Sequence, residues 1–282
     1  MPELPEVETI ARGLHGLLAG LQISAIRIVD GGCLAHGSDR CGGALAGRTI
    51  DRVWRRAKLV LLDLAGGYHL AFHLKMTGKL LIKEPGAEVL DKHTRLIFSL
   101  SDAKSLVFQD VRKFGYCRVL TGEELSKWPF FNRLGPEPLE MSASELEGLF
   151  QRRTGRIKPL LLNQEVIAGI GNIYADEALH LAGIHPAAAS SSLSGSDWRR
   201  LHQALRRVLQ EAIAAGGASF NDYVDGLGRR GSYQNGFWIY SRQGKPCYQC
   251  GAALEGMRIG GRSSVFCPAC QPGPADDTCQ AP

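Results

Sequence analysis

Residues 247–270 read Cys-Tyr-Gln-Cys-Gly-Ala-Ala-Leu-Glu-Gly-Met-Arg-Ile-Gly-Gly-Arg-Ser-Ser-Val-Phe-Cys-Pro-Ala-Cys, with two Cys-x-x-Cys pairs separated by 16 residues. Thiolates at this spacing can surround one Zn²⁺ ion tetrahedrally. The predicted ligands are Cys247, Cys250, Cys267 and Cys270. Four protein ligands leave no open coordination position, so the zinc is predicted to be structural. Gly260-Gly261 suits the tip of a hairpin that presents Arg262 outward.

The composition of the rest of the chain is that of a globular protein. The 282 residues favour two domains, and 44% hydrophobic with 22% charged residues argues against a mostly disordered chain. The 33 basic residues exceed the 28 acidic ones, for a formal charge of +5. This mild excess permits a nucleic-acid partner without demonstrating one.

Neither a membrane span nor a signal peptide is predicted. No apolar run approaches the roughly 20 residues of a membrane span. The start, Met-Pro-Glu-Leu-Pro-Glu-Val-Glu, carries three acids and no basic region. Without an export signal, metal binding is a more natural use of eight cysteines than disulfides. The cysteines without a partner at metal spacing, and without an assigned role, are Cys33, Cys41, Cys117 and Cys279.

Hydrophobic patterning predicts helix, then strands, then helices. Pro5 and Glu6 suit the start of an amphipathic helix over residues 5–18. Short β-branched and apolar runs predict strands from about residue 21 to about residue 120, as in a sandwich or barrel, and the pattern changes after residue 131. The clearest are Ile23–Val29, Ala57–Leu64, Tyr68–Leu74, Thr94–Leu100 and Lys104–Gln109, with a hairpin turn at Ser101-Asp102-Ala103.

Helical signals follow a proline-rich joint at 134–139. Ser142 with Glu145 forms the pattern of a capping box. Further helices are predicted over Ala175–Leu181 and Ser196–Ala215, with Gly216 as a stop.

Three features coincide in chain order: Pro2-Glu3-Leu4-Pro5-Glu6, the segment Gly169-Ile-Gly-Asn-Ile-Tyr-Ala-Asp176, and the four-cysteine finger with Arg262. Together they resemble the formamidopyrimidine-DNA glycosylase family of bacterial base-excision repair enzymes. Supporting matches are Arg55–Lys58, His73–Gly78, Asp110–Gly115, Leu134–Pro138 and Ala182–Pro186. The resemblance extends from residue 2 to about residue 271.

The resemblance implies an α+β protein with an N-terminal helix, a β-sandwich, a helix-two-turn-helix domain and a zinc finger. The expected ranges are a catalytic sandwich at 2–131, a linker at 132–141, the helical domain at 142–236, the finger at 237–271 and a tail at 272–282. Residues 217–236 fall where such enzymes carry a lesion-capping loop, and their glycines fit mobility.

The resemblance also implies a catalytic amine at Pro2. Met1 precedes a small residue, so an aminopeptidase is expected to remove it and free the secondary amine. An α-amine titrates near pH 8, which leaves a usable neutral fraction at pH 7. That amine can attack C1′ of a damaged nucleotide, displace the base and form a Schiff base. β-elimination and δ-elimination then cut the strand.

Further roles follow from matching positions. Glu3 is implied as general acid/base, with Glu6 as a supporting carboxylate. Lys58 is implied to help base release and to contact phosphate. Arg262 matches the finger arginine credited with δ-elimination. A guanidinium holds its proton too tightly to be a good acid near neutral pH, so phosphate positioning is the better-founded role.

An extruded base leaves a gap in the duplex that the protein must fill. Met76, Arg112 and Phe114 match the family's void-filling trio, in which apolar side chains wedge between base steps. Further implied DNA contacts are His73, His93, Arg153, Lys158, Asn172 and Tyr240. Two departures stand out: Lys75 replaces a common glycine, which predicts a stiffer and more basic loop, and Lys113 replaces a common arginine.

The expected function is a bifunctional DNA glycosylase/AP lyase for oxidised purines such as 8-oxoguanine and formamidopyrimidines. Leu4 and the complete void-filling trio favour this branch. Two alternatives stay open: an endonuclease VIII-like enzyme for oxidised pyrimidines, and a noncatalytic zinc-ribbon DNA-binding protein. The expected partner is damaged double-stranded DNA, bound by a cytoplasmic bacterial monomer that does not use a membrane.

Overall fold

The computed structural model describes residues 1–36, 40–41, 43–87, 90–151, 153–219 and 223–273. Its contacts divide the chain into two compact units. The N-terminal unit joins Met1–Arg133 to Ala212–Gln234, and the C-terminal unit joins Leu134–Glu211 to the segment from Asn235 onward. Helices and strands occur in both units, which agrees with the predicted α+β class.

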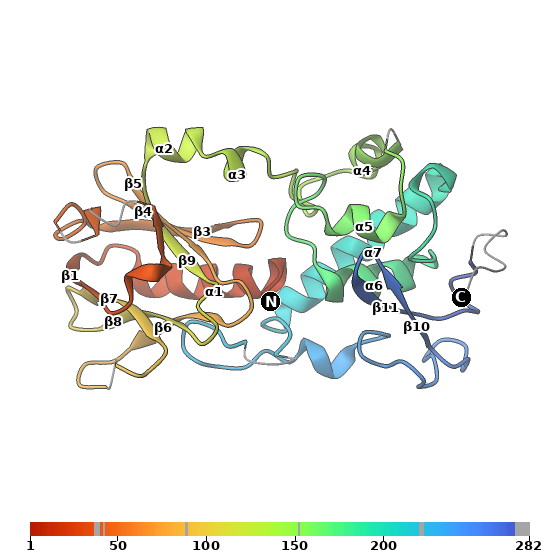
Figure 1. Ribbon diagram of the computed structural model, residues 1–282. Coiled ribbons are helices and arrows are strands. Elements are labelled where there is room, and N and C mark those ends of the chain that lie inside the picture. Colours follow the sequence, from red (N-terminus) through yellow and green to blue (C-terminus); the bar gives the residue numbers. More distant parts are fainter. Residues whose placement is uncertain (37–39, 42, 88–89, 152, 220–222, 274–282) are drawn as a thin grey trace. The chain divides into compact units, whose positions relative to one another are not determined.

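Two sheets face each other in the N-terminal unit (Figure 1). The five-stranded sheet runs in the order β2 (Leu34–His36), β9 (Tyr116–Thr121), β5 (Tyr68–His73), β4 (Leu59–Leu64) and β3 (Ile50–Arg56). The four-stranded sheet runs β1 (Ile23–Ile28), β7 (Thr94–Leu100), β8 (Ser105–Asp110) and β6 (Gly78–Lys83). The β2–β9 pair is parallel, and the other strand pairs of these two sheets are antiparallel.

Aromatic side chains fill the space between the sheets. Phe72 of β5 meets Phe98 of β7 edge-on at 6.0 Å and Phe108 of β8 at 5.6 Å. All three rings are fully buried. Burial of one such side chain stabilises a fold by roughly 1.5–3 kcal/mol, so this cluster holds the two sheets together.

Helix α1 (Leu4–Leu18) packs on the five-stranded sheet, as the amphipathic pattern predicts. The helix buries Val7, Ile10, Leu14 and Leu18. Because Pro5 lies in the first turn, its missing N–H leaves no hydrogen bond unmade. The predicted helix over 5–18 is confirmed, and its start lies beside the proposed catalytic residues.

Several elements were not predicted. Strand β3 carries acidic and arginine side chains, which hide its half-buried pattern, and β2 has only three residues. Strands β6 and β9 were not among the predicted runs either. The strands of this unit end with β9 at Thr121, as predicted for the stretch up to about residue 120. The change of pattern expected after residue 131 comes earlier, because helices α2 (Gly122–Lys127) and α3 (Pro129–Asn132) follow β9. A capping box starts α2: the Glu124 N–H donates to Thr121 Oγ1 and the Thr121 N–H to Glu124 Oε2.

Helices dominate the C-terminal unit: α4 (Ala143–Gln151), α5 (Ile157–Leu162), α6 (Asn172–Ala182) and α7 (Gly195–Ala214). Stacking of Phe150 on Trp198 at 5.4 Å joins α4 to α7. The predicted capping box is present, since the Ser142 N–H donates to Glu145 Oε2 and the Glu145 N–H to Ser142 Oγ. Within the described ranges, no helix is long and apolar enough to cross a membrane.

The last residues of α7 and the segment up to Gln234 pack with the N-terminal unit. The predicted helical domain at 142–236 therefore does not coincide with a packing unit. Its range, like those of the other predicted domains, remains a prediction about family organisation. The finger follows as a hairpin of β10 (Glu255–Ile259) and β11 (Arg262–Phe266).

Candidate functional site

The N-terminal segment is buried at the start of α1. Pro2 and Glu3 are buried, whereas Met1 is half exposed. The Glu3 N–H donates to Glu6 Oε2 at 2.8 Å, and the Ala218 N–H donates to Glu6 Oε1 at 2.8 Å. The Glu6 carboxylate therefore fixes the backbone next to Pro2, consistent with the supporting role expected of it.

A tight turn between β3 and β4 carries Lys58. Ala57 adopts a left-handed conformation with φ of 51° there, which lets the chain reverse before β4. Arg55 of the same basic stretch forms an ion pair with Glu8 at 2.7 Å. That pairing, with the help of Arg12, holds the pKa of Glu8 below its ordinary value although burial acts to raise it. The neighbouring Lys58 is itself mostly buried.

His73 lies opposite the start of β4, paired in register with Leu59. Burial, together with the positive charges of Lys75 and Lys58, lowers its pKa to about 3. Its Nδ1 accepts the Lys75 N–H at 3.1 Å, as a neutral imidazole can. The predicted DNA contact of His73 would therefore use a neutral ring.

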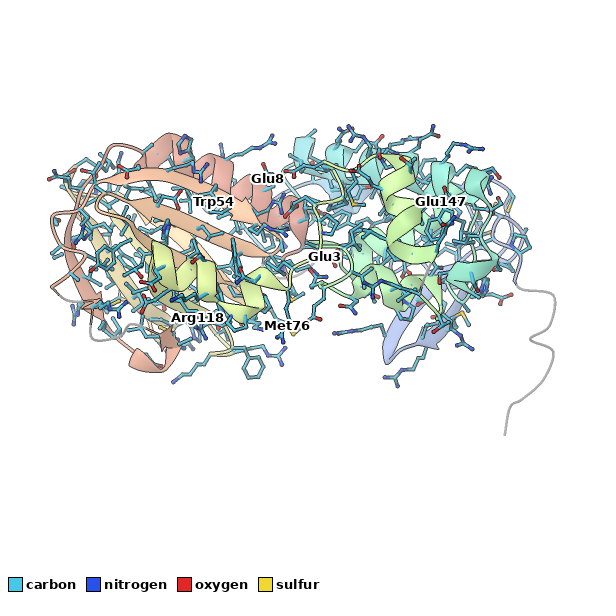
Figure 2. The ribbon with its side chains drawn as sticks, turned by 90° about the horizontal axis from the view of Figure 1, so that it is seen from above. Glu3, Glu8, Trp54, Met76, Arg118 and Glu147 are labelled. Atoms are coloured by element: carbon cyan, nitrogen blue, oxygen red, sulfur yellow. The ribbon has the colours of Figure 1, made fainter. Side chains whose placement is uncertain are left out.

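The three predicted void-filling side chains form a cluster on one surface. Met76 and Phe114 are 49% and 57% exposed, although both are large and apolar. Arg112 Nη1 lies 2.9 Å from Met76 Sδ, and its guanidinium carbon lies 4.9 Å from the centre of the Phe114 ring. Figure 2 places Glu3 and Met76 at the same end of the N-terminal unit.

Asp110 organises the loops that carry this cluster. The buried carboxylate accepts the Thr77 hydroxyl, the Arg112 N–H at 3.2 Å and the Gly115 N–H at 2.7 Å. One side chain thus holds both the Met76 loop and the Phe114 loop. Sequence reasoning did not single out this role, although Asp110 begins one of the quoted motifs.

The backbone at Lys75 and Lys113 is left-handed, a conformation that favours glycine. Lys75 has a φ of 50° and Lys113 a φ of 59°. An L-residue in this region costs about 1–2 kcal/mol relative to right-handed helical backbone, a cost that glycine avoids. Lys113 also pairs with Asp30 at 3.0 Å, so its charge is partly used within the protein.

In the C-terminal unit, Asn172 and Lys158 both hold the finger. Asn172, the first residue of α6, donates from Nδ2 to the Ser263 carbonyl at 3.0 Å. Lys158 Nζ lies 2.6 Å from Asp176 Oδ1, 2.6 Å from Ser264 Oγ and 3.0 Å from the Ser263 carbonyl. These contacts fix β11 immediately after Arg262.

The structure corrects the prediction for Lys158. Its side chain is 0% exposed and that of Asp176 1% exposed, so neither can reach a DNA phosphate in this arrangement. Burial raises the pKa of Asp176 above its ordinary value, and Lys158 opposes that shift. The signal missed in the sequence is Asp176 itself, an acid on the inner face of α6.

The remaining predicted DNA contacts are accessible to differing degrees. Arg153 is exposed, with Nε donating to the Leu149 carbonyl at 3.0 Å, and His93 is half-buried. The backbone of Tyr240 is held by Glu177, a buried acid that sequence reasoning also missed. The Glu177 carboxylate accepts the N–H groups of Trp238, Ile239 and Tyr240 at 2.8–3.0 Å.

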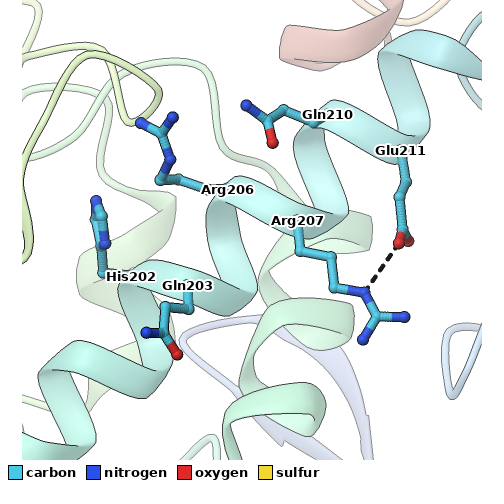
Figure 3. A pocket seen from close by; sticks show the side chains of 6 residues that line it. All are labelled: His202, Gln203, Arg206, Arg207, Gln210 and Glu211. Carbon is cyan, nitrogen blue, oxygen red and sulfur yellow. Dashed lines mark hydrogen bonds and ion pairs between the residues drawn. The ribbon is translucent and has the colours of Figure 1, made fainter.

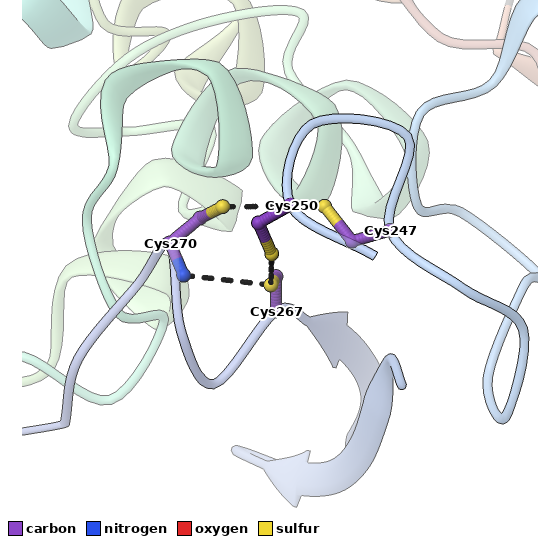
Figure 4. Close-up of side chains that lie close together, drawn as sticks. All are labelled: Cys247, Cys250, Cys267 and Cys270. Carbon is purple, nitrogen blue, oxygen red and sulfur yellow. Dashed lines mark hydrogen bonds between the residues drawn. The ribbon is translucent and has the colours of Figure 1, made fainter. Parts of the chain in front are cut away.

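The four predicted cysteine ligands come together (Figure 4). Their Sγ atoms all lie within 4.8 Å of one another, with 3.5 Å between Cys250 and Cys267 and 4.0 Å between Cys247 and Cys270. Tetrahedral Zn–S bonds of about 2.3 Å place sulfurs about 3.8 Å apart, which these separations bracket. The donor set therefore fits one structural Zn²⁺.

The finger hairpin presents Arg262 as expected. Ile259 pairs with Arg262 across a two-residue turn in which Gly260 and Gly261 have φ of 55° and 75°. Positive φ at both turn residues is the geometry that a tight hairpin requires and that glycine adopts freely. Arg262 is exposed beside this turn.

A hollow of about 500 Å³ lies on the surface of α7, and none of its lining residues is a predicted site residue (Figure 3). Its lining comprises His202, Gln203, Arg206, Arg207, Gln210 and Glu211. Arg206 donates to the Leu139 carbonyl at 2.7 Å, and Arg207 pairs with Glu211 at 2.9 Å. These cations are used in local packing, and we assign the hollow no function.

Three family descriptions match consecutive parts of the chain. They are the formamidopyrimidine-DNA glycosylase N-terminal domain over residues 1–117, the H2TH domain of the same enzyme over 134–224, and the zinc finger found in FPG and IleRS over 244–273. A formamidopyrimidine-DNA glycosylase of Heliobacterium modesticaldum is 44% identical over 276 residues, covering 96% of this chain and 100% of that protein. The chain belongs to the formamidopyrimidine-DNA glycosylase family.

Solved structures of family members have the same fold. A mutant FPG of Lactococcus lactis in complex with Fapy-dG-containing DNA is 34% identical, with a TM-score of 0.90 over 96% of this chain and 100% of that one. The L. lactis Fpg with abasic-site DNA is 33% identical with a TM-score of 0.89 over the same shares. Wild-type L. lactis FPG with oxidised-pyrimidine DNA is 34% identical with a TM-score of 0.88, again over the same shares.

Family membership identifies the metal of the finger as zinc. The zinc-finger description covers all four clustered cysteines, so the chain carries one structural Zn²⁺ at Cys247, Cys250, Cys267 and Cys270. With four thiolates in place the ion has no open position, so the reaction must use groups elsewhere.

Proposed function

We propose that this chain is a bifunctional DNA glycosylase and AP lyase that excises oxidised purines through Pro2. The observation that carries the proposal is the buried Pro2-Glu3 pair at the start of α1, in a chain that matches formamidopyrimidine-DNA glycosylases over 96% of its length. Relatives crystallised with Fapy-dG DNA and abasic-site DNA correspond to the two substrates that such an enzyme processes in turn.

The chemistry begins once Met1 is removed. The neutral amine of Pro2 attacks C1′ of the damaged nucleotide, and the electrons of the broken C1′–N bond leave with the base, which gains a proton. Glu3 is proposed to exchange protons at the sugar or the departing base, and Lys58 to assist base release. The proline nitrogen loses its proton, the C1′–O4′ bond then opens with a proton taken up by O4′, and the C1′=N iminium that forms acidifies the C2′ proton. Its loss expels the 3′ phosphate oxygen, and a second elimination expels the 5′ phosphate.

The exposed cluster of Met76, Arg112 and Phe114 supports binding of duplex DNA with an extruded base. The apolar side chains of Met76 and Phe114 are about half exposed to solvent and are available to insert between base steps. Arg112 lies between them and can hydrogen-bond the base left without its partner. Arg153, Asn172, Tyr240 and Arg262 are proposed to contact the phosphate backbone, together with His73 and His93.

Oxidised pyrimidines are the alternative substrate class. The L. lactis FPG complex with an oxidised-pyrimidine DNA is the observation that favours this alternative. Single-turnover excision from matched duplexes carrying 8-oxoguanine or thymine glycol decides between them. We expect faster excision of 8-oxoguanine. Much faster release of thymine glycol would overturn the purine preference. Binding without any excision would favour a noncatalytic DNA-binding protein.

We further propose that the protein acts as a monomer on chromosomal DNA in a bacterial cytoplasm. All of the predicted site residues come from one chain, so the proposed chemistry needs no second copy. Sedimentation of the protein with and without one abasic-site duplex tests this, and a 2:1 protein–DNA complex at saturation would contradict it.

A further inference from the structure

Glu6 touches two parts of the chain that lie more than 200 residues apart in sequence. Its Oε2 accepts the Glu3 N–H and its Oε1 accepts the Ala218 N–H, both at 2.8 Å. The residue is 2% exposed. Because each carboxylate oxygen faces a different backbone donor, movement of either segment must disturb the contact with the other.

Gly217 packs directly against the same carboxylate. A Cβ added at Gly217 would lie 3.0 Å from both Cγ and Oε1 of Glu6, and 3.1 Å from the Tyr223 ring. The φ of Gly217 is +82°, which glycine tolerates best. A side chain at residue 217 would therefore force Glu6 or Tyr223 to shift.

A third contact ties Tyr223 to the same point. Its hydroxyl donates to the Glu6 carbonyl at 3.3 Å, and its own carbonyl accepts the Ser219 hydroxyl at 2.9 Å. The N–H of Gly231 donates to that Ser219 hydroxyl at 2.9 Å. Ala218 and Tyr223 are thus both held at Glu6, while residues 220–222 lie outside the described ranges.

We propose that Glu6 is a positioning residue that transmits the arrangement of residues 217–219 to the Pro2-Glu3 segment. The inference rests on the proposed function of Pro2. A change confined to the 217–219 side would then alter the rate at which Pro2 reacts, even on a substrate that has no base to recognise. A merely structural Glu6, serving only as an acid in the first turn of α1, would change stability without changing that rate.

The test compares two Gly→Ala substitutions at positions with similar positive φ, so that both variants carry a similar backbone strain. Gly217→Ala pushes on Glu6, whereas Gly20→Ala introduces a side chain at a similar φ of +87° with nothing within 4 Å. Each variant, with Met1 removal verified by mass spectrometry, is mixed in excess with a preformed abasic-site duplex and trapped with borohydride. Affinity for an uncleavable abasic analogue and the Tm are measured in parallel.

We expect Gly217→Ala to slow trapping by about tenfold, corresponding to one lost hydrogen bond of about 1.4 kcal/mol at the reacting segment, with affinity for the analogue within about twofold. Gly20→Ala should trap at the wild-type rate. Glu6→Gln, which keeps one accepting oxygen but turns its amide group toward the other N–H, should slow trapping similarly. This second variant decides the test if Gly217→Ala does not fold.

Wild-type trapping rates in both Gly217→Ala and Glu6→Gln would overturn the inference while leaving the function of Pro2 intact. The same holds if Gly217→Ala slows only excision of 8-oxoguanine and leaves abasic-site trapping unchanged, because the segment would then serve base recognition alone. A wild-type protein that cannot be trapped would instead remove the proposed function, and the inference with it.

Discussion

His73 is buried beside two lysines, and its pKa falls to about 3 from an ordinary value near 6.5. Between these values the unfolded chain binds a proton at this residue and the folded chain does not. The free energy of unfolding therefore contains a contribution that is complete above pH 6.5 and declines as the pH falls toward 3, by about 1.4 kcal/mol per pH unit.

A His73→Gln variant should lose this part of the acid sensitivity. Urea unfolding at pH 7 and pH 5 should show the wild type losing about 2 kcal/mol more than the variant over that interval. All other titrating groups are common to the two proteins, so the difference isolates His73. Parallel pH profiles for the two proteins would mean that the imidazole is accessible to protons in the folded state.

Lys158 is used inside the protein, in contrast with its predicted contact to DNA. Lys158→Met leaves the buried Asp176 carboxyl without its partner, a change that typically destabilises by about 3–5 kcal/mol. Adding Asp176→Asn should recover most of that loss. Urea unfolding of the single and double variants measures both effects.

The salt dependence of DNA affinity distinguishes a cation buried in the protein from a cation that contacts a DNA phosphate. The double variant Lys158→Met/Asp176→Asn should keep the wild-type slope of log affinity against log salt concentration on an abasic-analogue duplex. The exposed Arg153, changed to Met, should lower that slope by about one unit if it contacts a phosphate. A slope lowered by the double variant but not by Arg153→Met would reverse the two assignments.

At the scale of elements, the finger has too little apolar core to fold without metal. Its buried cluster comprises Ile239, Cys247, Leu254, Val265 and Cys267, two of which are metal ligands. Zinc binding contributes about 10–16 kcal/mol in comparable fingers. The metal therefore determines whether β10 and β11 present Arg262 at all.

Removing zinc should unfold the finger and leave the sandwich intact. Hydrogen exchange after chelation should accelerate over residues 247–270 and stay unchanged over β4 and β5, while DNA affinity is lost. Restoring Zn²⁺ should restore both protection and binding. Unchanged DNA affinity in verified metal-free protein would contradict the proposed role of the finger.

Local chemistry made several elements predictable, while others needed tertiary context. Pro5 and the apolar stripe of α1, the Ser142–Glu145 capping box and the Gly260-Gly261 hairpin each contain their own signal. Strand β3 does not, because its exposed face carries charged residues. The sequence does not indicate the roles of the buried acids Asp110, Asp176 and Glu177. Their backbone and lysine hydrogen-bond donors come from residues that only the tertiary fold brings close to each carboxylate.

At the scale of the whole molecule, one chain supplies a sandwich, a helical unit and a metal-stabilised hairpin, and packing does not follow their order in sequence. Residues 212–234 return to the N-terminal unit, where Ala218 meets Glu6. The formal charge of +5 is small for a chain of 282 residues, and Arg55 and Lys113 are paired with acids. DNA binding must therefore depend on where a few cations are placed rather than on the total charge.

The central claim is that the amine of Pro2 forms a Schiff base with an abasic site, and borohydride trapping tests it most directly. The protein, with Met1 removal verified by mass spectrometry, is trapped on an abasic-site duplex, and the crosslinked residue is identified by peptide mapping. We predict a crosslink at Pro2 and loss of most trapping in Pro2→Gly. A correctly processed wild-type protein that cannot be trapped, or a crosslink on another residue, would contradict the account.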